Sequence, residues 1–148
     1  MKIEFVKSSD KKKILEKLEQ DFGIEKLNFL LIKSGKDKIR GFTGSLSKDE
    51  ILALSRNANI EVIGLYLFKE ENGMRLSFDA PFLLKAKKNI VEISGEQAEN
   101  WLKGMNIEIE IDKEGFVVLK NKQDFLGCGK ASQGRIANFV PKERRIKS

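Results

Sequence analysis

The sequence contains no histidine and only one cysteine among its 148 residues. The usual zinc and iron sites cannot be assembled from that set of ligands. Acid–base catalysis by imidazole is excluded, and so are the Ser-His-Asp and Cys-His arrangements of nucleophilic enzymes. Catalysis by carboxylates or lysine stays open, but it needs a supporting spacing of residues. These absences lower the expectation of an enzyme.

Long hydrophobic runs are also lacking. The apolar stretch at 29–32 is typical of the longest ones, and a bilayer span needs about 20 such residues. Lys2 and Glu4 interrupt the first residues, where a secretory leader would be apolar. The single Cys128 cannot form an internal disulfide, which fits a reducing compartment. We therefore expect a cytoplasmic protein with no membrane segment, and the 41% of hydrophobic residues suffices for a folded core.

The charge is distributed unevenly along the chain. Its 28 basic and 22 acidic residues give a net charge of +6. Residues 118–148 contain eight Lys and Arg but only two acidic residues, so residues 1–117 hold 20 of each sign. The C-terminal part therefore carries the whole excess, which indicates a polyanionic partner there.

The N-terminal part alternates between strand and helix patterns. Ser8, Ser9 and Asp10 are candidate N-caps of a helix with one apolar stripe, and Gly23 ends it. A capping box at 47–50 opens a second helix, which extends to about residue 57. A bend at 79–81 is expected to lead into another extended piece. The strands predicted in this part cover residues 2–7, 27–33, 38–42, 60–68 and 74–78, with turns at 34–37 and 70–73.

A polar bridge at 85–89 predicts a domain boundary. Beyond it, Ser94 and Gln97 form a second capping box, and the helix that follows ends at Gly104. The strands predicted here cover residues 90–93, 107–111, 116–120, 125–131 and 135–140. Short strands with frequent turns are typical of a small closed or half-closed barrel. The expected fold class is α+β, with a mixed α/β domain at 1–88 and a barrel at 89–148.

The basic C-terminal set is the strongest functional candidate. In 135–140, strand alternation places Arg135 and Phe139 on one face, and Pro141 ends the strand. Lysine and arginine there can neutralise phosphates, which makes binding salt-dependent. A solvated surface with a frayed basic tail explains the same clustering, and charge alone gives the two interpretations about equal weight.

Three other features favour structural roles. Two glycines flank Cys128 in a predicted strand, which indicates a bulge, a corner or close backbone approach, and no base is available to activate that thiol. The Gly-x-Gly-Lys run lacks the spacing of a phosphate loop. Trp101 can stack on a base but belongs more often to a core. The carboxylates at 49–50 and 70–71 occupy cap and turn positions and form no catalytic pair.

Residues 94–145 resemble the PUA-like RNA-binding domains, in particular the module at the C-terminus of rRNA cytosine methyltransferases of the NOL/NOP/Sun group. The matching runs are Trp101-Leu102-Lys103-Gly104, then 124–130, then 134–142 with the two arginines that follow. Roughly the first 85 residues are similar in pattern to the pre-PUA domain of Nip-type ribosome-biogenesis factors. The shared features there are the opening helix, the two-strand turn, the capped helix and the run at 75–78.

The resemblance implies an RNA-recognition module without its catalyst. The methyltransferases carry a Rossmann-like catalytic domain with a Pro-Cys motif, whereas Cys128 follows a glycine and no cofactor loop is found. We expect no catalytic residue, no metal and no cofactor. The resemblance places RNA on the short helix, the glycine loop after it and the last strands. The residues that it implies are Lys103, Gly104, Lys130, Arg135, Lys142, Arg144 and Arg145.

Lys120 and Lys122 are added to the RNA-binding candidates from charge alone. The expected function is non-catalytic binding of structured RNA, rRNA or tRNA, in ribosome biogenesis or RNA modification. Charge reversal at Arg144 and Arg145 is expected to weaken RNA binding and to leave the fold intact. The alternative is a protein-interaction adaptor that recruits a separate RNA methyltransferase or assembly factor. An RNA-modifying enzyme with a carboxylate site is the least favoured hypothesis.

Overall fold

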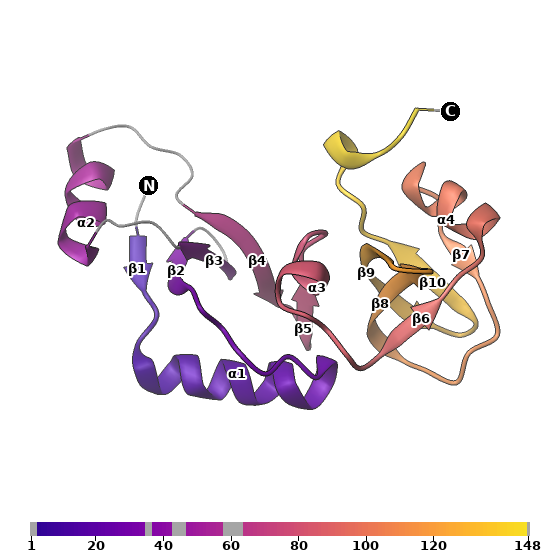
Figure 1. Ribbon diagram of the computed structural model, residues 1–148, viewed down its shortest axis with the longest axis horizontal. Coiled ribbons are helices and arrows are strands. Elements are labelled where there is room, and N and C mark those ends of the chain that lie inside the picture. The colour runs from indigo at the N-terminus through magenta and orange to yellow at the C-terminus, as the bar shows by residue number, and fades with distance from the viewer. Residues whose placement is uncertain (1–2, 35–36, 43–46, 58–63, 148) are drawn as a thin grey trace.

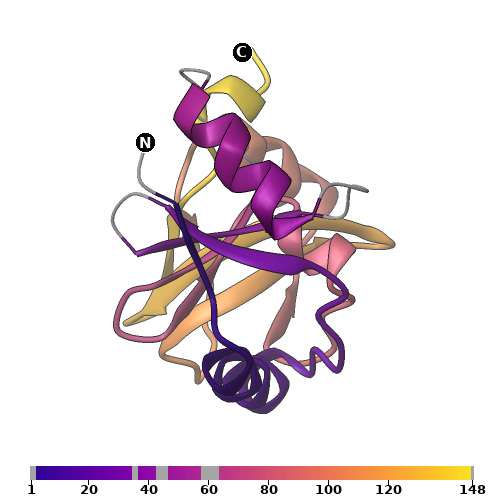
Figure 2. The same ribbon diagram turned by 90° about the vertical axis from the view of Figure 1, so that its left-hand side faces the viewer.

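The computed structural model describes residues 3–34, 37–42, 47–57 and 64–147, and these form two five-stranded sheets side by side (Figure 1). The first sheet is antiparallel throughout, with the order β1-β2-β3-β4-β5. Its strands are β1 (Ile3–Phe5), β2 (Leu30–Ser34), β3 (Lys38–Phe42), β4 (Leu65–Glu70) and β5 (Met74–Leu76). The helices of this part are α1 (Ser8–Phe22), α2 (Lys48–Asn57) and α3 (Ala80–Leu83). Figures 1 and 2 show α1 and α2 on opposite sides of the sheet.

The second sheet has the order β6-β8-β9-β10-β7 and curls into a half-barrel (Figure 1). Its strands are β6 (Ile90–Glu92), β7 (Ile107–Glu108), β8 (Gly115–Asn121), β9 (Asp124–Ser132) and β10 (Arg135–Asn138). β6 runs parallel to β8, and the other pairs are antiparallel. Helix α4 (Gly95–Leu102) and a single 3₁₀ turn, η1 (Lys142–Arg144), complete this part. The predicted mixture of helix and sheet with a half-closed barrel is confirmed.

Local capping signals fix several helix ends as predicted. At α2, the Glu50 N–H donates to Ser47 Oγ and the Ser47 N–H donates to Glu50 Oε1, both at 3.2 Å. At α4, Ser94 and Gln97 exchange the equivalent bonds at 3.1 and 2.9 Å. Gly23 closes α1 with φ +66°, and its N–H donates to Glu19 O. These bonds satisfy backbone groups that a helix end leaves without partners.

Two predictions about the N-terminal part are wrong. The N-cap of α1 is Lys7, since the Lys11 N–H donates to Lys7 O at 2.8 Å and the following serines lie inside the helix. The bend at 79–81 leads into α3 and not into an extended piece. Pro81 lies in the first turn of α3, where a missing N–H costs nothing and a fixed φ favours the helix.

Two predicted strands of the C-terminal part are shorter in the structure. Only Ile107–Glu108 of 107–111 pairs with β10, because β10 begins at Arg135; the Ile109 N–H donates to Gly134 O in the turn before it. The last strand ends at Asn138, because the Asn138 side chain accepts the Val140 N–H at 2.8 Å and draws the chain into a loop. The predicted turn at 35–36 and the predicted strand residues 60–63 lie outside the described residues.

The hydrophobic core crosses from one sheet to the other. One cluster combines Phe22 of α1 and Phe68 of β4 with Val118 and Cys128 of the half-barrel. The chain between α3 and β6 is tied down as well, because the N–H groups of residues 87 and 88 both donate to Phe22 O. A second cluster lies inside the half-barrel around Trp101, which has no exposed surface. The two sheets therefore hold each other in a fixed arrangement.

Candidate nucleic-acid interface

A glycine loop follows α4 and is held by one asparagine. Gly104 has φ +99°, a left-handed conformation that favours glycine. The Asn138 side-chain amide donates to Trp101 O at 2.7 Å and to Met105 O at 2.8 Å. The Asn138 N–H also donates to Asn106 Oδ1 at 2.8 Å. The end of β10 therefore fixes both sides of the glycine loop.

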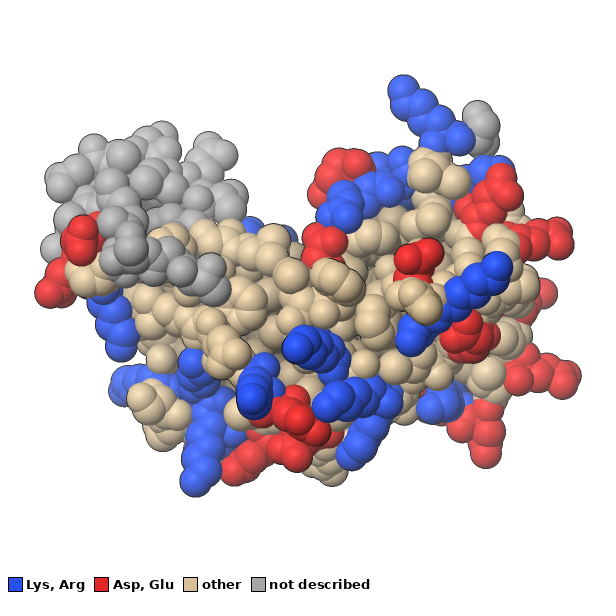
Figure 3. Space-filling model, in the orientation of Figure 1, with Lys and Arg blue, Asp and Glu red and all other residues tan. Residues whose placement is uncertain are grey.

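The basic C-terminal segment folds back onto this loop. The Ile146 N–H donates to Leu102 O at 2.9 Å, and Arg145 Nε donates to Val140 O at 3.0 Å. A Cβ built on Gly104 would lie 2.8 Å from the guanidinium carbon of Arg145, so that side chain rests on bare backbone. Figure 3 shows Lys and Arg side chains on the raised C-terminal segment. The loop and the basic segment form one surface, which we call the Gly104 surface (residues 103–105, 142 and 145).

Three of the predicted RNA-binding residues come together here, and a fourth lies close along the chain. Lys103 is the C-cap of α4, and its ammonium lies 3.3 Å from Glu99 of the same helix. Gly104 and Arg145 touch each other as described above. Lys142 begins η1 in the same C-terminal segment and is exposed.

Arg144 has a structural role that the sequence does not reveal. Its guanidinium donates two hydrogen bonds to Asp79, at 2.7 and 3.0 Å, and lies 4.7 Å from the centre of the Phe78 ring. The bond to Asp79 is the main cause that raises the pKa of Arg144. Charge reversal at Arg144 would break this contact between distant segments. That the fold stays intact on this reversal remains a prediction, and Arg145 is the position where RNA binding can be tested without disturbing the contact to Asp79.

The other four predicted cations lie on strands β8–β10 and the β8–β9 hairpin, outside the loop and the C-terminal segment. Lys120 and Lys122 lie at the β8–β9 hairpin, where Lys120 faces Phe125 across the ladder. Phe125 is four residues along β9 from Gly129, the register partner of Asn138, which places it about 13 Å away. Arg135 begins β10 at its opposite end, and Lys130 lies 5.7 Å from the Phe116 ring.

The two glycines around Cys128 serve close packing, as predicted. A Cβ on Gly129 would lie 2.6 Å from both Trp101 Cη2 and Ile136 Cγ2. Gly127 has φ +85° and lies where the β8–β9 register shifts. The Trp101 ring N–H donates to the Leu126 carbonyl at 2.7 Å, which confirms the core role of this tryptophan.

Cys128 is a packed thiol and not a nucleophile. Burial raises its pKa to about 12, so the thiolate is not formed near neutral pH. Within the described ranges, no group of three or more His, Cys, Asp and Glu side chains is placed to hold a metal ion. The Gly104 surface offers cations and backbone groups for binding.

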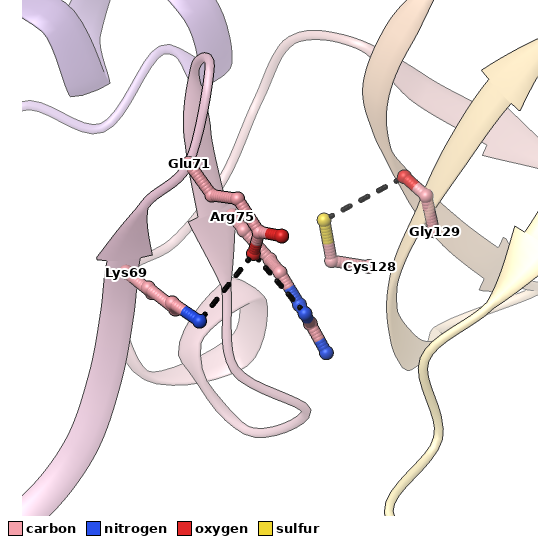
Figure 4. A network of polar contacts seen from close by, with 5 residues as sticks. All are labelled: Lys69, Glu71, Arg75, Cys128 and Gly129. Atoms are coloured by element: carbon pink, nitrogen blue, oxygen red, sulfur yellow. Dashed lines mark hydrogen bonds and ion pairs between the residues drawn. The ribbon is translucent and has the colours of Figure 1, made fainter. Parts of the chain in front are cut away.

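The sequence gives no sign of a second cluster of cations and aromatic rings. The Arg75 guanidinium lies 4.0 Å from the centre of the Phe139 ring, although Arg75 belongs to β5 and Phe139 follows β10 of the other sheet. Glu71 holds Arg75 at 3.3 Å and Lys69 at 3.7 Å (Figure 4). The run Arg75-Leu76-Ser77-Phe78 lies in this cluster. The sequence of the run does not show which distant residue Arg75 contacts.

Comparison with known proteins identifies the C-terminal part. The family model described as the methyltransferase RsmF PUA domain matches residues 88–146. Residues 88–146 form a PUA-like domain. PUA domains are generally RNA-binding modules, so the Gly104 surface belongs to a module of an RNA-binding family. No curated protein matches the chain.

A solved structure has the same fold over almost the whole chain. It is described as a conserved PUA domain protein from Thermoplasma acidophilum, and it is 14% identical with a TM-score of 0.63. The match covers 96% of each chain, so the sheet before the PUA-like domain is included in the shared fold. In the part of the chain that the structure describes, no helix has the length and apolar character needed to span a membrane.

Proposed function

We propose that this protein is a non-catalytic, cytoplasmic RNA-binding protein that acts on rRNA, or on tRNA, in ribosome biogenesis or RNA modification. The observation that carries the proposal is the contact between the Arg145 guanidinium and the bare backbone of Gly104 in a PUA-like domain. We assign the PUA-like RNA-binding part to 89–148 and a pre-PUA domain of the Nip type to 1–88.

The chemistry of the Gly104 surface suits an RNA backbone. Structured RNA presents phosphates and 2′-hydroxyls on a wide minor groove, and proteins bind it largely through these groups and its shape. Arg145 is oriented through Nε, so its two terminal nitrogens are left as donors for a phosphate. The absence of a Cβ at Gly104 lets the Arg145 guanidinium lie directly on the loop backbone, which fixes the position of its charge for a phosphate.

A specific observation supports the adaptor as the second candidate. Phe82 and Leu83 of α3 are 69% and 40% exposed, which is unusual for large apolar side chains. With Phe125 they line a hollow of about 400 Å³ whose rim carries Lys85 and Lys87. An apolar patch with a basic rim fits a partner protein such as an RNA methyltransferase or an assembly factor.

Crosslinking in native cell extract tests the proposal. The tagged protein is crosslinked to RNA and the bound RNA is sequenced, with an Arg145→Glu variant processed in parallel. Enrichment of one rRNA or tRNA region that Arg145→Glu loses supports the proposal. Background RNA together with a protein partner that Phe82→Ala loses would favour the adaptor instead.

A further inference from the structure

A cleft lies between the two sheets, beside the C-terminal segment. It encloses about 190 Å³ and is lined by β4, β5 and the C-terminal segment. Tyr66, Arg75, Ser77 and Phe139 are among the lining residues, and so are Arg144, its partner Asp79, and Glu143. Figure 3 shows a hollow of mostly uncharged surface in this region, beside the raised C-terminal segment.

Arg75 packs on the ring of Phe139 at this cleft, and we call these two residues the platform. Its guanidinium lies 4.0 Å from the Phe139 ring centre, and Phe139 lies 6.1 Å from Phe116 with the rings inclined by 50°. The edge of the guanidinium is held by Glu71 (Figure 4). Its side chain keeps 29% of its surface exposed. A guanidinium fixed in this way offers a flat, oriented cationic surface, on which an unstacked base can lie.

The ring of Tyr66 supplies a second flat surface in the same cleft, and two cations lie beside this ring. Lys38 Nζ lies 5.2 Å and the Arg40 guanidinium 6.0 Å from its ring centre. The two cations come from β3, where Arg40 is the register partner of Tyr66. Burial raises the pKa of Tyr66, so its hydroxyl remains a hydrogen-bond donor. A ring with cations beside it suits single-stranded RNA, whose bases stack on aromatic rings while its phosphates bind Lys and Arg.

Ser77 adds a polar group that lacks a partner. Among the described residues, its hydroxyl is the one buried side-chain polar atom without a hydrogen bond. Its backbone N–H is used, since it donates to Leu67 O at 2.9 Å. A buried hydroxyl without a partner is costly and requires an explanation. A ligand atom that reaches the base of the cleft can supply the missing bond.

We propose that this cleft binds one unstacked base of a single-stranded RNA segment, between Tyr66 and the platform of Arg75 on Phe139. Lys38 and Arg40 then bind the phosphates that flank this base. The proposal rests on the proposed function and adds a second binding site to it. Structured RNA held at the Gly104 surface would place an adjoining unpaired nucleotide in the cleft. The protein would then bind both structured and single-stranded RNA.

The affinity for a short fluorescein-labelled single-stranded RNA, measured by anisotropy, tests this cleft. Stacking on one aromatic ring contributes about 1–3 kcal/mol per base, so Tyr66→Leu should weaken binding about 5- to 150-fold. Tyr66→Phe keeps the ring and should retain most of the affinity. Ser77→Ala should weaken binding about 2- to 12-fold without reducing the thermal stability of the free protein. Phe5→Leu is the matched control, a half-buried aromatic of β1 outside the cleft, and should change nothing.

Two outcomes separate this inference from the proposed function. If Tyr66→Leu binds the single strand as the wild type does, while Arg145→Glu loses a structured RNA hairpin, the cleft proposal is overturned and the Gly104 surface stands. If the hairpin is not bound by the wild type, the proposed function itself fails. Photocrosslinking of a 5-iodouridine RNA locates the base directly. A crosslink in the peptide of Tyr66 or Phe139 supports the cleft, and crosslinks confined to other peptides contradict it.

Discussion

Asn138→Ala tests whether one side chain fixes the glycine loop. The substitution removes three side-chain hydrogen bonds, those to Trp101 O, Met105 O and the Val140 N–H, with lengths of 2.7, 2.8 and 2.8 Å. A neutral hydrogen bond contributes about 1 kcal/mol net, so a full loss would be about 3 kcal/mol. Water replaces part of the exposed bond to Met105 O. We therefore expect the free energy of unfolding to fall by about 2 kcal/mol.

Urea denaturation measures this loss, with Asn106→Ala as the comparison. Asn106 accepts a single bond, from the Asn138 N–H at 2.8 Å, and its removal should cost about 1 kcal/mol. The m-value should stay constant, since neither change alters the surface exposed on unfolding. Affinity for an RNA hairpin should fall more for Asn138→Ala than for Asn106→Ala. A loss of stability under about 0.5 kcal/mol for Asn138→Ala, or one no greater than that for Asn106→Ala, would refute the reasoning.

Three further predictions follow from packing and charge. Gly129→Ala puts a Cβ 2.6 Å from Trp101 and should cost about 1–3 kcal/mol in urea denaturation; an unchanged midpoint would mean that the core relaxes freely. The Cys128 thiol, whose ordinary pKa is 9.0, ionises in the unfolded chain as pH rises above 9, whereas in the folded protein its pKa is about 12. Unfolding therefore becomes easier by about 1.4 kcal/mol per pH unit between these values, and Cys128→Ala should remove that part of the slope; equal slopes would contradict it. A double-mutant cycle of Asp79→Ala and Arg144→Ala should give a coupling free energy of about 0.5–1 kcal/mol. The value is small because both side chains are more than a third exposed. A coupling near zero would mean that this ion pair does not stabilise the fold.

Most features that depend on residues a few positions apart were predicted correctly from the sequence, with the N-cap of α1 as an exception. Ser94 with Gln97, and Gly23 after an apolar stripe, satisfy backbone groups of the neighbouring turn, and no distant partner changes that requirement. The glycines around Cys128 indicated close packing for the same reason, since a missing Cβ has a local meaning. The basic C-terminal excess and the Lys103-Gly104 run also indicated the surface where the loop and the last segment meet.

Features that depend on contacts between distant residues were missed. Arg144 was predicted to bind RNA, and the sequence did not reveal its partner Asp79, which lies 65 residues away. The cleft between the sheets needs Tyr66 of β4 and Phe139 after β10, and neither residue is distinctive alone. The strand expected at 107–111 is short because β10 offers few partners, and a strand pattern does not reveal the length of the neighbouring strand.

The salt dependence of RNA binding tests the role of the Gly104 surface most directly. Affinity for an RNA hairpin is measured by filter binding over a range of salt concentrations for the wild type, Arg145→Glu and Lys12→Glu. Lys12 is an exposed residue of α1 and provides the same change of charge elsewhere. We predict that the affinity falls steeply as the salt concentration rises. Arg145→Glu should weaken binding and reduce the slope of log affinity against log salt concentration by about 0.7–0.9 for each phosphate that the variant no longer neutralises. Lys12→Glu should leave this slope unchanged. A flat profile, or equal slopes for Arg145→Glu and the wild type, would contradict an RNA-binding role of this surface.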